Sequence, residues 1–237
     1  MSLTATDQSA SAHEFEFKPL EYARNYRHAL VSEFAPCLQG EVLEVGAGVG
    51  HITALLRTLP LVRKVVALEP EPLFHPHLCQ ILPAESVLPG TADQIREDSW
   101  NAIVCVNVLE HIGDDAHELK TYRSLLQRQH GCLCLFVPAR QELYAPIDRD
   151  FGHFRRYDRP GLAAKLKQAG FEIMRLDYYN FLGYFIWWFN FKILKNRRFD
   201  RGKIVIFDRF IFPMIHALES KLMRPPFGQS LLAVARA

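Results

Sequence analysis

One segment near the start of the chain constrains the fold more than any other. Residues 42–50 read VLEVGAGVG, an apolar run that ends in three alternating glycines, and the stretch HITALLRTL after it has the spacing of a helix. Glycine lets the backbone adopt positive φ and pass close to a ligand, because it has no Cβ. A strand, glycine turn and helix in this order predict an α/β sheet with a nucleotide-like cofactor at the turn.

An acidic residue further along supports the same prediction. The apolar run VVALE ends in Glu69, 19 residues after Gly50. A carboxylate at the end of the second strand of such a sheet is placed to accept hydrogen bonds from both ribose hydroxyls. The first half of the chain therefore predicts a site for an adenosine-containing ligand.

Apolar runs and helical patterns alternate along the rest of the chain. We expect strands near 41–46, 64–69, 86–89, 101–107, 131–137, 171–178 and at the final run QSLLAVARA, and helices near 20–36, 50–59, 72–82, 115–128 and 160–169. Such alternation predicts a mostly parallel sheet with helices on both faces. Ligands of these sheets bind beyond the carboxyl ends of the strands.

The glycine spacing distinguishes two cofactor classes. The dinucleotide fingerprint needs Gly or Ala at position 51, where this chain has His51, so an NAD-dependent oxidoreductase is a disfavoured alternative. The tighter G-x-G-x-G follows Glu44, and the segments ALEP, GTADQI and NAIVCVNVLEHIGDD come after it in that order. This series resembles the ordered motifs of class I S-adenosylmethionine (SAM)-dependent methyltransferases.

The resemblance implies a fold and a set of cofactor contacts. The fold is a Rossmann-like class I methyltransferase sheet, mostly parallel with the last strand antiparallel, and the cofactor is SAM. The residues that it assigns to SAM are Glu44, Gly46, Ala47, Gly48, Gly50, Glu69, Pro70, Ala92, Asp93, Asn107, Val108 and His111. The glycine turn is expected to face the methionine part, Ala92 and Asp93 the adenine, and Asn107 and Val108 the sulfonium. Asp93 has a second interpretation as an exposed helix N-cap.

The pair Glu110 and His111 resembles the corresponding pair in ubiquinone-pathway O-methyltransferases, where carboxylates and His hold a divalent metal. Here Asn107 stands three positions before Glu110, where an acid would supply another anionic ligand. Because hard cations prefer several oxygen ligands, we expect no metal. His111 then has either a catalytic, orienting role or a structural one. We expect Cys132 and Cys134 to be buried thiols on one strand face and not zinc ligands.

A polar and aromatic segment, residues 139–158, follows the fifth strand and is expected to form a lid on the acceptor side. We expect Tyr144, Asp148 and His153 to be catalytic, together with His111, and His153 to act as the base. Arg155, Arg156 and Tyr157 are expected to bind the acceptor, since paired arginines can grip a carboxylate or phosphate. The alternative is an internally paired lid, in which Asp148 and Asp150 balance the two arginines. The pattern D-R-x-x-G-H-x-R-R-Y resembles a bacterial subgroup of type 11/12 methyltransferases.

Residues 180–226 separate the last two strands and are expected to form a helical insertion. Six aromatic residues lie between Phe181 and Phe189, and six cations follow up to Lys203. The apolar stretch is too short for a confident bilayer span. The segment 181–203 is therefore expected either to pack on the sheet or in a homodimer, or to make peripheral contact with an anionic membrane and cover a lipid-like acceptor.

Charge and composition narrow the function. The formal net charge is +2, which disfavours a nucleic-acid partner. Residues 1–18 lack the pattern of a secretory signal and are expected to be a disordered leader before a single domain, 19–237; an odd number of cysteines favours the cytoplasm. We expect a SAM-dependent methyltransferase acting on a small-molecule or lipid-like acceptor, with oxygen the favoured atom. The alternative is a catalytically silent SAM-binding or scaffold protein of the same fold.

Overall fold

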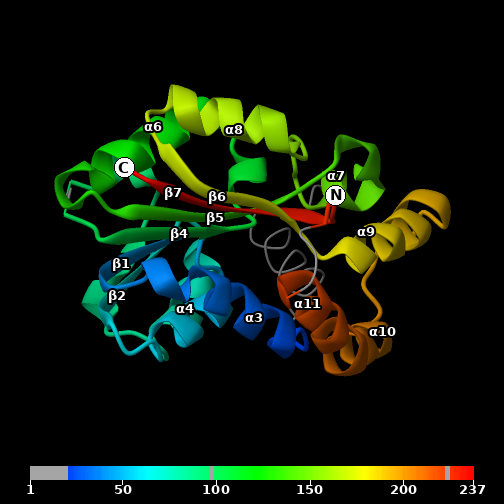
Figure 1. Ribbon diagram of the computed structural model, residues 1–237. Helices are drawn as coiled ribbons and strands as arrows, with labels where there is room; N and C mark the ends of the chain where they lie inside the picture. The colour runs from blue at the N-terminus through cyan, green and yellow to red at the C-terminus, as the bar shows by residue number, and fades with distance from the viewer. Residues whose placement is uncertain (1–20, 97–98, 222–224) are drawn as a thin grey trace, which may run out of the picture.

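A single sheet organises the computed structural model, which describes residues 21–96, 99–221 and 225–237. The predicted leader, 1–18, lies outside the described residues. The seven strands are β1 (Gly40–Val45), β2 (Val62–Glu69), β3 (Val87–Pro89), β4 (Ala102–Val106), β5 (Cys132–Pro138), β6 (Glu172–Tyr179) and β7 (Ser230–Arg236). Their order across the sheet is β3-β2-β1-β4-β5-β7-β6 (Figure 1). Each predicted strand is present.

The direction of the strands also agrees with the prediction. The pairs β1–β2, β1–β4, β2–β3 and β4–β5 are parallel, whereas β7 runs antiparallel to both β5 and β6. The segment between β6 and β7 leaves the sheet and returns to it at the same edge, as the pairing of Tyr179 with Ser230 shows. A strand that enters from the carboxyl edge has to run opposite to its neighbours, and this explains the single antiparallel strand.

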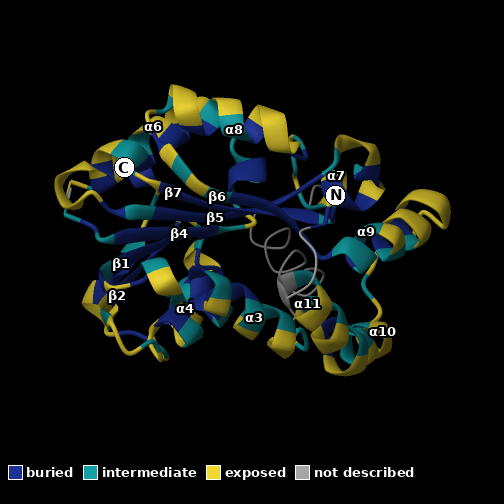
Figure 2. Cartoon of the chain, viewed as in Figure 1, coloured by how far each residue is buried: buried dark blue, intermediate teal, exposed yellow. Residues whose placement is uncertain are grey.

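Alternate residues of the strands point to opposite faces, and helices cover both. On one face Leu133 and Leu135 pack with residues of α6 (Asp115–Leu126) and α8 (Arg159–Gln168). On the other, Cys134 and Phe136 pack with residues of α3 (Arg24–Phe34) and α4 (His51–Leu56). Figure 2 shows the buried strands between these two layers. The shorter helices are α5 (His75–Leu78) and α7 (Pro146–Asp150).

The five cysteines are free thiols. Cys134 is fully buried and Cys132, on the same strand face, is partly buried. Burial raises the pKa of Cys134, as expected for a thiol in the core. Among the described residues, one group of His and Glu side chains could hold a metal ion, and it contains neither Cys132 nor Cys134.

The insertion between β6 and β7 is helical, as predicted. It contains α9 (Phe181–Trp187) with a π-helical continuation over Trp188–Ile193, then α10 (Arg201–Ile206), a second π-helical segment over Phe207–Ile211, and α11 (Phe212–Lys221). These helices form one end of the molecule, on the right in Figure 1. Among the described residues, no helix combines the length and the apolar character needed to cross a bilayer.

Two carboxylates fasten the insertion to the sheet layer. Asp208 is buried and accepts hydrogen bonds from the backbone N–H groups of Asn25 and Tyr26, at 3.0 and 2.9 Å, where α3 begins. Glu219 accepts from the N–H groups of Asn180 and Phe181, at 3.0 and 2.6 Å, at the start of α9. Both acids satisfy N–H groups that a helix leaves without an internal partner. The insertion is thereby held over the carboxyl edge of the sheet.

Candidate functional site

The glycine turn after β1 has the strained backbone that its sequence predicts. Gly46, Gly48 and Gly50 have φ values of 71°, 54° and 84°, in the left-handed region that favours glycine. A Cβ added to Gly46 would lie 2.3 Å from Cγ2 of Val108, so the turn packs directly on the segment after β4. The fold therefore brings together two predicted cofactor segments that are about sixty residues apart in sequence.

Two buried carboxylates lie beside this turn. Glu69 accepts hydrogen bonds from Gly48 N–H at 2.7 Å and from Glu71 N–H at 2.9 Å. Glu44 accepts a hydrogen bond from the Thr53 hydroxyl at 2.5 Å. Burial raises the pKa of Glu69, and burial together with the charge of Glu69 raises the pKa of Glu44 to about 8. A ligand that brings a positive charge or hydroxyl donors would stabilise the ionised form of both groups.

The other predicted cofactor residues lie at the ends of neighbouring strands. Ala47 is buried within the turn, and Pro70 is exposed directly after β2. Ala92 is buried and Asp93 exposed in a 3₁₀ turn, Ala92–Gln94, whose N-cap is Thr91; the Thr91 hydroxyl donates to the Asp93 carboxylate.

Asn107 follows β4 at a φ of 54°, and its N–H donates to the Phe136 carbonyl at 2.8 Å. Asn107 also contributes to the wall of a cavity.

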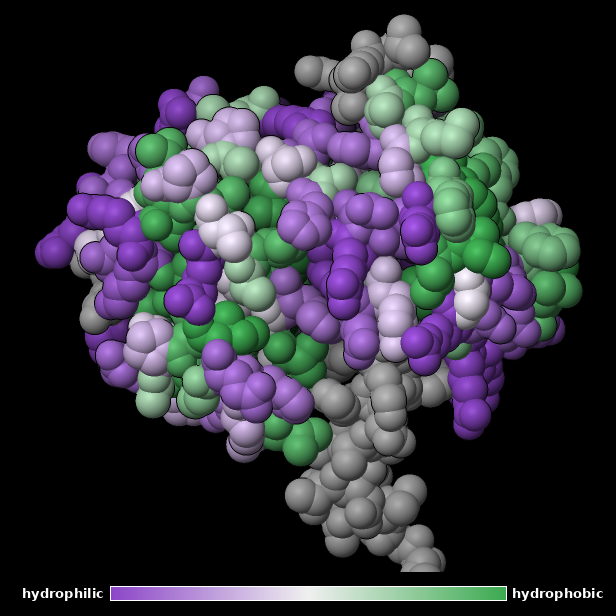
Figure 3. Space-filling model, turned by 90° about the horizontal axis from the view of Figure 1, so that it is seen from below, coloured by the Kyte–Doolittle hydropathy of each residue, from purple (hydrophilic) through white to green (hydrophobic). Residues whose placement is uncertain are grey.

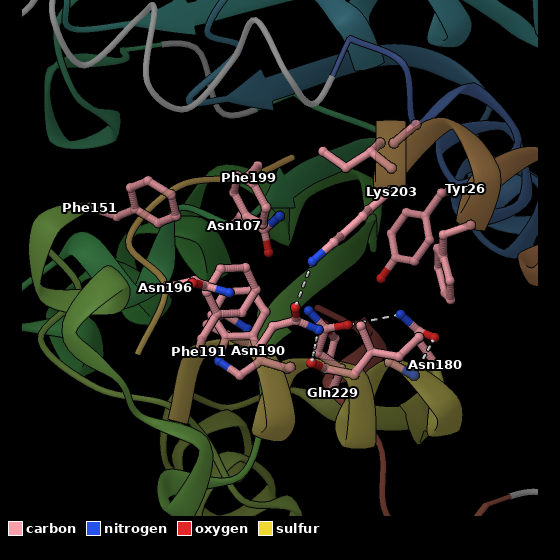
Figure 4. A pocket seen from close by; sticks show the side chains of 18 of the residues that line it. Tyr26, Asn107, Phe151, Asn180, Asn190, Phe191, Asn196, Phe199, Lys203 and Gln229 are labelled. Carbon is pink, nitrogen blue, oxygen red and sulfur yellow. Dashed lines mark hydrogen bonds between the residues drawn. The ribbon is translucent and has the colours of Figure 1, made fainter. Parts of the chain in front are cut away.

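This cavity, of about 730 Å³, lies between the carboxyl ends of the strands and the insertion. Figure 4 shows that its walls combine aromatic rings with amide side chains, which point into one space. The rings and amides are those of Tyr26, Asn107, Phe136, Phe151, Asn180, Trp187, Asn190, Phe191, Asn196, Phe199, Phe207 and Gln229. Two contacts link these walls: Asn180 donates to Gln229 at 2.9 Å, and Lys203 donates to Asn190 at 3.4 Å. Such a lining suits a ligand with a large apolar body and a few polar groups.

One side of the cavity is a buried ionic network built on Asp148. The Oδ1 atom of Asp148 lies 3.1 Å from Nδ1 of His153 and accepts from Arg156 Nε at 2.8 Å, while Oδ2 accepts from Ala145 N–H at 2.8 Å. Burial alone would raise the pKa of Asp148, but the His153 hydrogen bond and the Arg156 charge hold it below its usual value. The Arg156 guanidinium stacks 4.4 Å above the ring of Trp187. Asp148 is therefore ionised and fixes the orientation of the His153 ring.

The opposite nitrogen of His153 faces a second group. His153 Nε2 lies 3.9 Å from Oε1 of the buried Glu110, and the rings of His153 and His111 meet edge to face at 4.6 Å. Burial, with a smaller effect of His153, lowers the pKa of His111 to about 4, so His111 is neutral at physiological pH. One ligand atom from each of Glu110, His111 and His153 lies within 4.8 Å of the others, so the three can hold a metal ion.

The remaining residues of the predicted lid are committed to structural contacts. Arg155 forms an ion pair with Asp115 at 2.8 Å and donates to the carbonyls of Ile112 and Gly113. Tyr157 is buried, and its hydroxyl donates to Asp115 at 2.9 Å. These two residues lie outside the cavity lining, whereas Arg156 and His153 belong to it. The assignment of Arg155, Arg156 and Tyr157 to acceptor binding stays a prediction.

The predicted pairing within the lid is present only in part. Asp148 does pair with Arg156, but Asp150 pairs with Arg197 of the insertion, with Nε to Oδ2 at 2.7 Å. The Tyr144 hydroxyl donates to the backbone carbonyl of His153 at 2.7 Å and so supports the lid from within. Sequence reasoning missed the amides Asn180, Asn190 and Gln229 and the ring of Trp187, which come from the insertion and its flanks. Their one sequence signal was the aromatic density of 181–189.

Comparisons with known proteins agree with this geometry. A family model described as a methyltransferase domain matches residues 20–176. A methyltransferase of Haloferax volcanii, solved with the Trm112 methyltransferase activator, is similar at a TM-score of 0.65 and 16% identity, over 97% of this chain and 95% of that one. An S-adenosylmethionine-dependent methyltransferase of Mesorhizobium loti is similar at a TM-score of 0.57 and 16% identity, over 88% of this chain and 96% of that one. DhpI, solved in complex with SAH, is similar at a TM-score of 0.59 and 16% identity, over 98% of this chain and 93% of that one. No curated protein matches the sequence significantly.

Proposed function

Since the chain belongs to the class I SAM-dependent methyltransferases, we propose that it transfers the methyl group of SAM to a hydroxyl oxygen of an amphipathic, lipid-like acceptor. The cofactor is SAM, and methyl transfer from its sulfonium requires an acceptor aligned with the methyl group and a group that removes the acceptor's proton. The proposal concerns the residues that meet these two requirements and the chemical class of the acceptor.

The residues around the glycine turn fit the cofactor. The left-handed glycines let the backbone lie against the methionine part, and Glu44 is a buried acid beside this turn, suited to the ammonium group. Glu69 would bind the ribose hydroxyls, with its two backbone hydrogen bonds holding the carboxylate in place. Ala92 and Asp93 would flank the adenine, and Asn107 and Val108 the sulfonium. Asn107 also lines the cavity, so donor and acceptor meet at the end of β4.

The observation that carries the proposal is the Asp148–His153 pair in the cavity wall. Asp148 holds Nδ1 of His153 at 3.1 Å, which leaves Nε2 directed toward Glu110 at 3.9 Å. A histidine oriented by a carboxylate in this way can accept a proton at Nε2. His153 then removes the acceptor's hydroxyl proton, and the aromatic walls bury the apolar body of the acceptor.

A second candidate mechanism uses a divalent metal. Glu110, His111 and His153 bring their ligand atoms within 4.8 Å of one another, and Asp148 supports His153 from behind, as carboxylates do for many metal-binding histidines. A divalent ion held by these three residues would supply Lewis acidity to the acceptor hydroxyl, and His153 would then be a ligand and not the base. The sequence prediction of a metal-free site and this alternative differ in one measurable property, the effect of a chelator.

The test is an acceptor screen with isotopically labelled donor. Purified protein is incubated with trideuteromethyl-SAM and a total lipid and metabolite extract, and labelled products are identified by tandem mass spectrometry. We expect label on oxygen of an amphipathic compound, absent with His153→Ala. Label on nitrogen or carbon would contradict O-methylation. Loss of activity with EDTA and recovery with Zn²⁺, Mn²⁺ or Mg²⁺ would replace the His153 mechanism by the metal mechanism.

A further inference from the structure

The insertion exposes an unusual concentration of large hydrophobic side chains. Thirteen such side chains are exposed among the described residues, and nine of them lie between positions 181 and 219. They are Phe185, Trp188, Phe189, Ile193, Leu194, Ile206, Phe210, Met214 and Leu218. Scattered exposed hydrophobic residues need no explanation, but a cluster of this size on one element marks an interaction surface.

The nine residues follow the geometry of the helices. Phe185, Trp188 and Phe189 are three and four positions apart along α9 and its π-helical continuation, so they share one side. Ile206, Phe210, Met214 and Leu218 recur at every fourth position along α10, the second π-helical segment and α11. The other sides of these helices bury Trp187, Phe191 and Phe212. We call the nine exposed residues the apolar face.

The pictures place the apolar face on the outer side of the molecule. In Figure 2 exposed residues cover the outer surfaces of α9, α10 and α11, away from the sheet. In Figure 3, which views the molecule from below, hydrophobic side chains gather at the same end and are bordered by hydrophilic ones. The apolar face is thus not needed to cover the core of this chain.

The charge around the apolar face is strongly positive. Between positions 181 and 219 there are seven Lys and Arg residues and three acids, a net charge of +4, while the whole chain carries only +2. All three acids serve the fold: Asp208 is buried against α3, Glu219 binds the start of α9, and Asp200 caps α10 by accepting from Lys203 N–H at 2.9 Å. The cations are exposed, and one of them, Arg197, pairs with Asp150 of the lid.

We propose that the apolar face docks on an anionic membrane surface. Aromatic and aliphatic side chains flanked by Lys and Arg bind at the boundary between headgroups and acyl chains, and each cation near such a surface contributes about 1 kcal/mol. A second copy of the chain is the less suitable partner, because two faces that both carry a positive net charge would repel each other when they meet. The positive charge therefore favours an anionic bilayer over a second copy of the chain as the partner.

Docking would also bring the cavity to the lipids. Arg197, Arg198 and Lys203 are exposed and at the same time line the cavity, so it opens within the positively charged part of the insertion. A lipid-like acceptor could pass from the bilayer into the cavity without crossing water. This step rests on the proposed function, whereas the docking itself does not.

A vesicle experiment with an internal reporter tests the docking. The full chain is mixed with vesicles of phosphatidylcholine, with and without phosphatidylglycerol, and binding is measured by flotation. Of the three tryptophans, Trp100 and Trp187 are 1% and 7% exposed, whereas Trp188 is 43% exposed. We expect binding to the anionic vesicles only, weakened by salt, with a blue shift of Trp fluorescence and quenching by brominated lipid. Trp188→Phe should still bind but lose both spectral changes.

Matched variants complete the test. The double substitution Phe210→Ser with Met214→Ser should weaken vesicle binding at least 10-fold, because it removes two exposed apolar contacts. Leu61→Ser with Met174→Ser, which are also exposed (64% and 47%) but lie outside the insertion, should leave binding unchanged. The proposal is overturned if anionic vesicles do not bind, or if light scattering shows a vesicle-free dimer that the first variant dissociates. SAM titration of each variant separates this result from a failure of the proposed methyl transfer.

Discussion

The donor side and the acceptor side of this site are built in different ways. On the donor side, the hydrogen bonds of the two acids span 9 and 21 residues: the Thr53 hydroxyl donates to Glu44, and the backbone N–H of Gly48 donates to Glu69. On the acceptor side, the insertion supplies side chains that reach back over long sequence distances. The Trp187 indole donates to the Leu143 carbonyl at 3.1 Å, and Asp208 binds the start of α3, more than 180 residues earlier.

This difference determines how much substitution each side of the site can tolerate. A donor site made of backbone conformation and two acids tolerates little change, because each glycine occupies a conformation that other residues reach only with strain. An acceptor cavity made of side chains from a separate insertion can change its lining without disturbing the sheet. In the proposed function, the fold therefore fixes the donor, and the insertion determines the acceptor.

The largest expected effect concerns the acceptor side. His153→Ala should lower the turnover of the identified acceptor by about 100- to 10,000-fold, the usual contribution of a general base, and leave SAM affinity unchanged. Turnover and calorimetric SAM binding are measured in parallel. His117→Ala, an exposed residue of α6, is the control. A variant that keeps its rate but loses thermal stability would place His153 in lid packing.

A change to the glycine turn should affect the donor side next most strongly. Gly46→Ala places a Cβ at 2.3 Å from Val108 and an alanine at a φ of 71°. Overpacking costs about 1–3 kcal/mol, and left-handed strain adds to it. We expect SAM affinity, measured by calorimetry, to fall by at least about 30-fold.

Gly170→Ala separates the two contributions. Gly170 has a φ of 91°, but its added Cβ would meet only ordinary contacts, 3.6 Å from Arg123. This variant should lose a little stability and bind SAM normally. The double variant Gly46→Ala with Val108→Ala, which removes the colliding methyl groups, should recover part of the affinity. Normal SAM binding by Gly46→Ala alone would show that the turn does not approach the cofactor.

The same distinction explains what the sequence could predict. The seven strands follow from apolar periodicity and from punctuation by glycine and proline, which act over a few residues, and the helical insertion follows from the length of the segment between the last two strands. The resemblance to methyltransferases supplied the antiparallel direction of the last strand, and the order of the strands across the sheet was not predicted. The π-helical segments at Trp188–Ile193 and Phe207–Ile211 were not predicted, because they depend on how the insertion packs.

The sequence pattern constrained the placement of the donor-side residues more than that of the acceptor-side residues, and the roles assigned on both sides stay predictions. Asp148, His153 and Arg156 were predicted to serve catalysis or acceptor binding; the structure unites them in one network, and those roles stay predictions. The same pattern gave no sign that Arg155 would turn to Asp115 at the start of α6. Partner choice among neighbouring arginines is a property of tertiary packing, so sequence spacing alone left both readings of the lid open.

Glu69→Gln should have an intermediate effect on the donor side. The amide keeps the shape of the side chain but loses the charge that would bind the ribose hydroxyls, and hydrogen bonds to charged groups are worth about 1.5–3 kcal/mol. We expect SAM affinity to fall about 10- to 100-fold with a small change in melting temperature. Glu69→Ala would be less informative, since it removes the acceptors of both Gly48 N–H and Glu71 N–H, whereas the amide of Gln keeps one of them. Unchanged affinity of Glu69→Gln would contradict the ribose assignment.

The smallest expected effect is the release of a proton from Glu44 when SAM binds. Burial raises the pKa of Glu44 from 4.5 to about 8, so this group stabilises the folded protein fully below pH 4.5, and the contribution is lost as the pH rises through about 8. If Glu44 binds the cationic end of SAM, the ligand lowers its pKa, and binding at pH 7 should release up to about one proton per SAM. Calorimetry in buffers of different ionisation enthalpy measures this release.

Glu44→Gln should abolish the proton release and flatten the decline of melting temperature between pH 5 and 9. Glu41→Gln, on the same strand but partly exposed, should change neither. Equal proton release by wild type and Glu44→Gln would remove Glu44 from the cofactor site. In that case the Thr53 hydrogen bond at 2.5 Å would define Glu44 as a buried acid that holds α4 against β1, and the donor side would depend on Glu69 and the glycine turn.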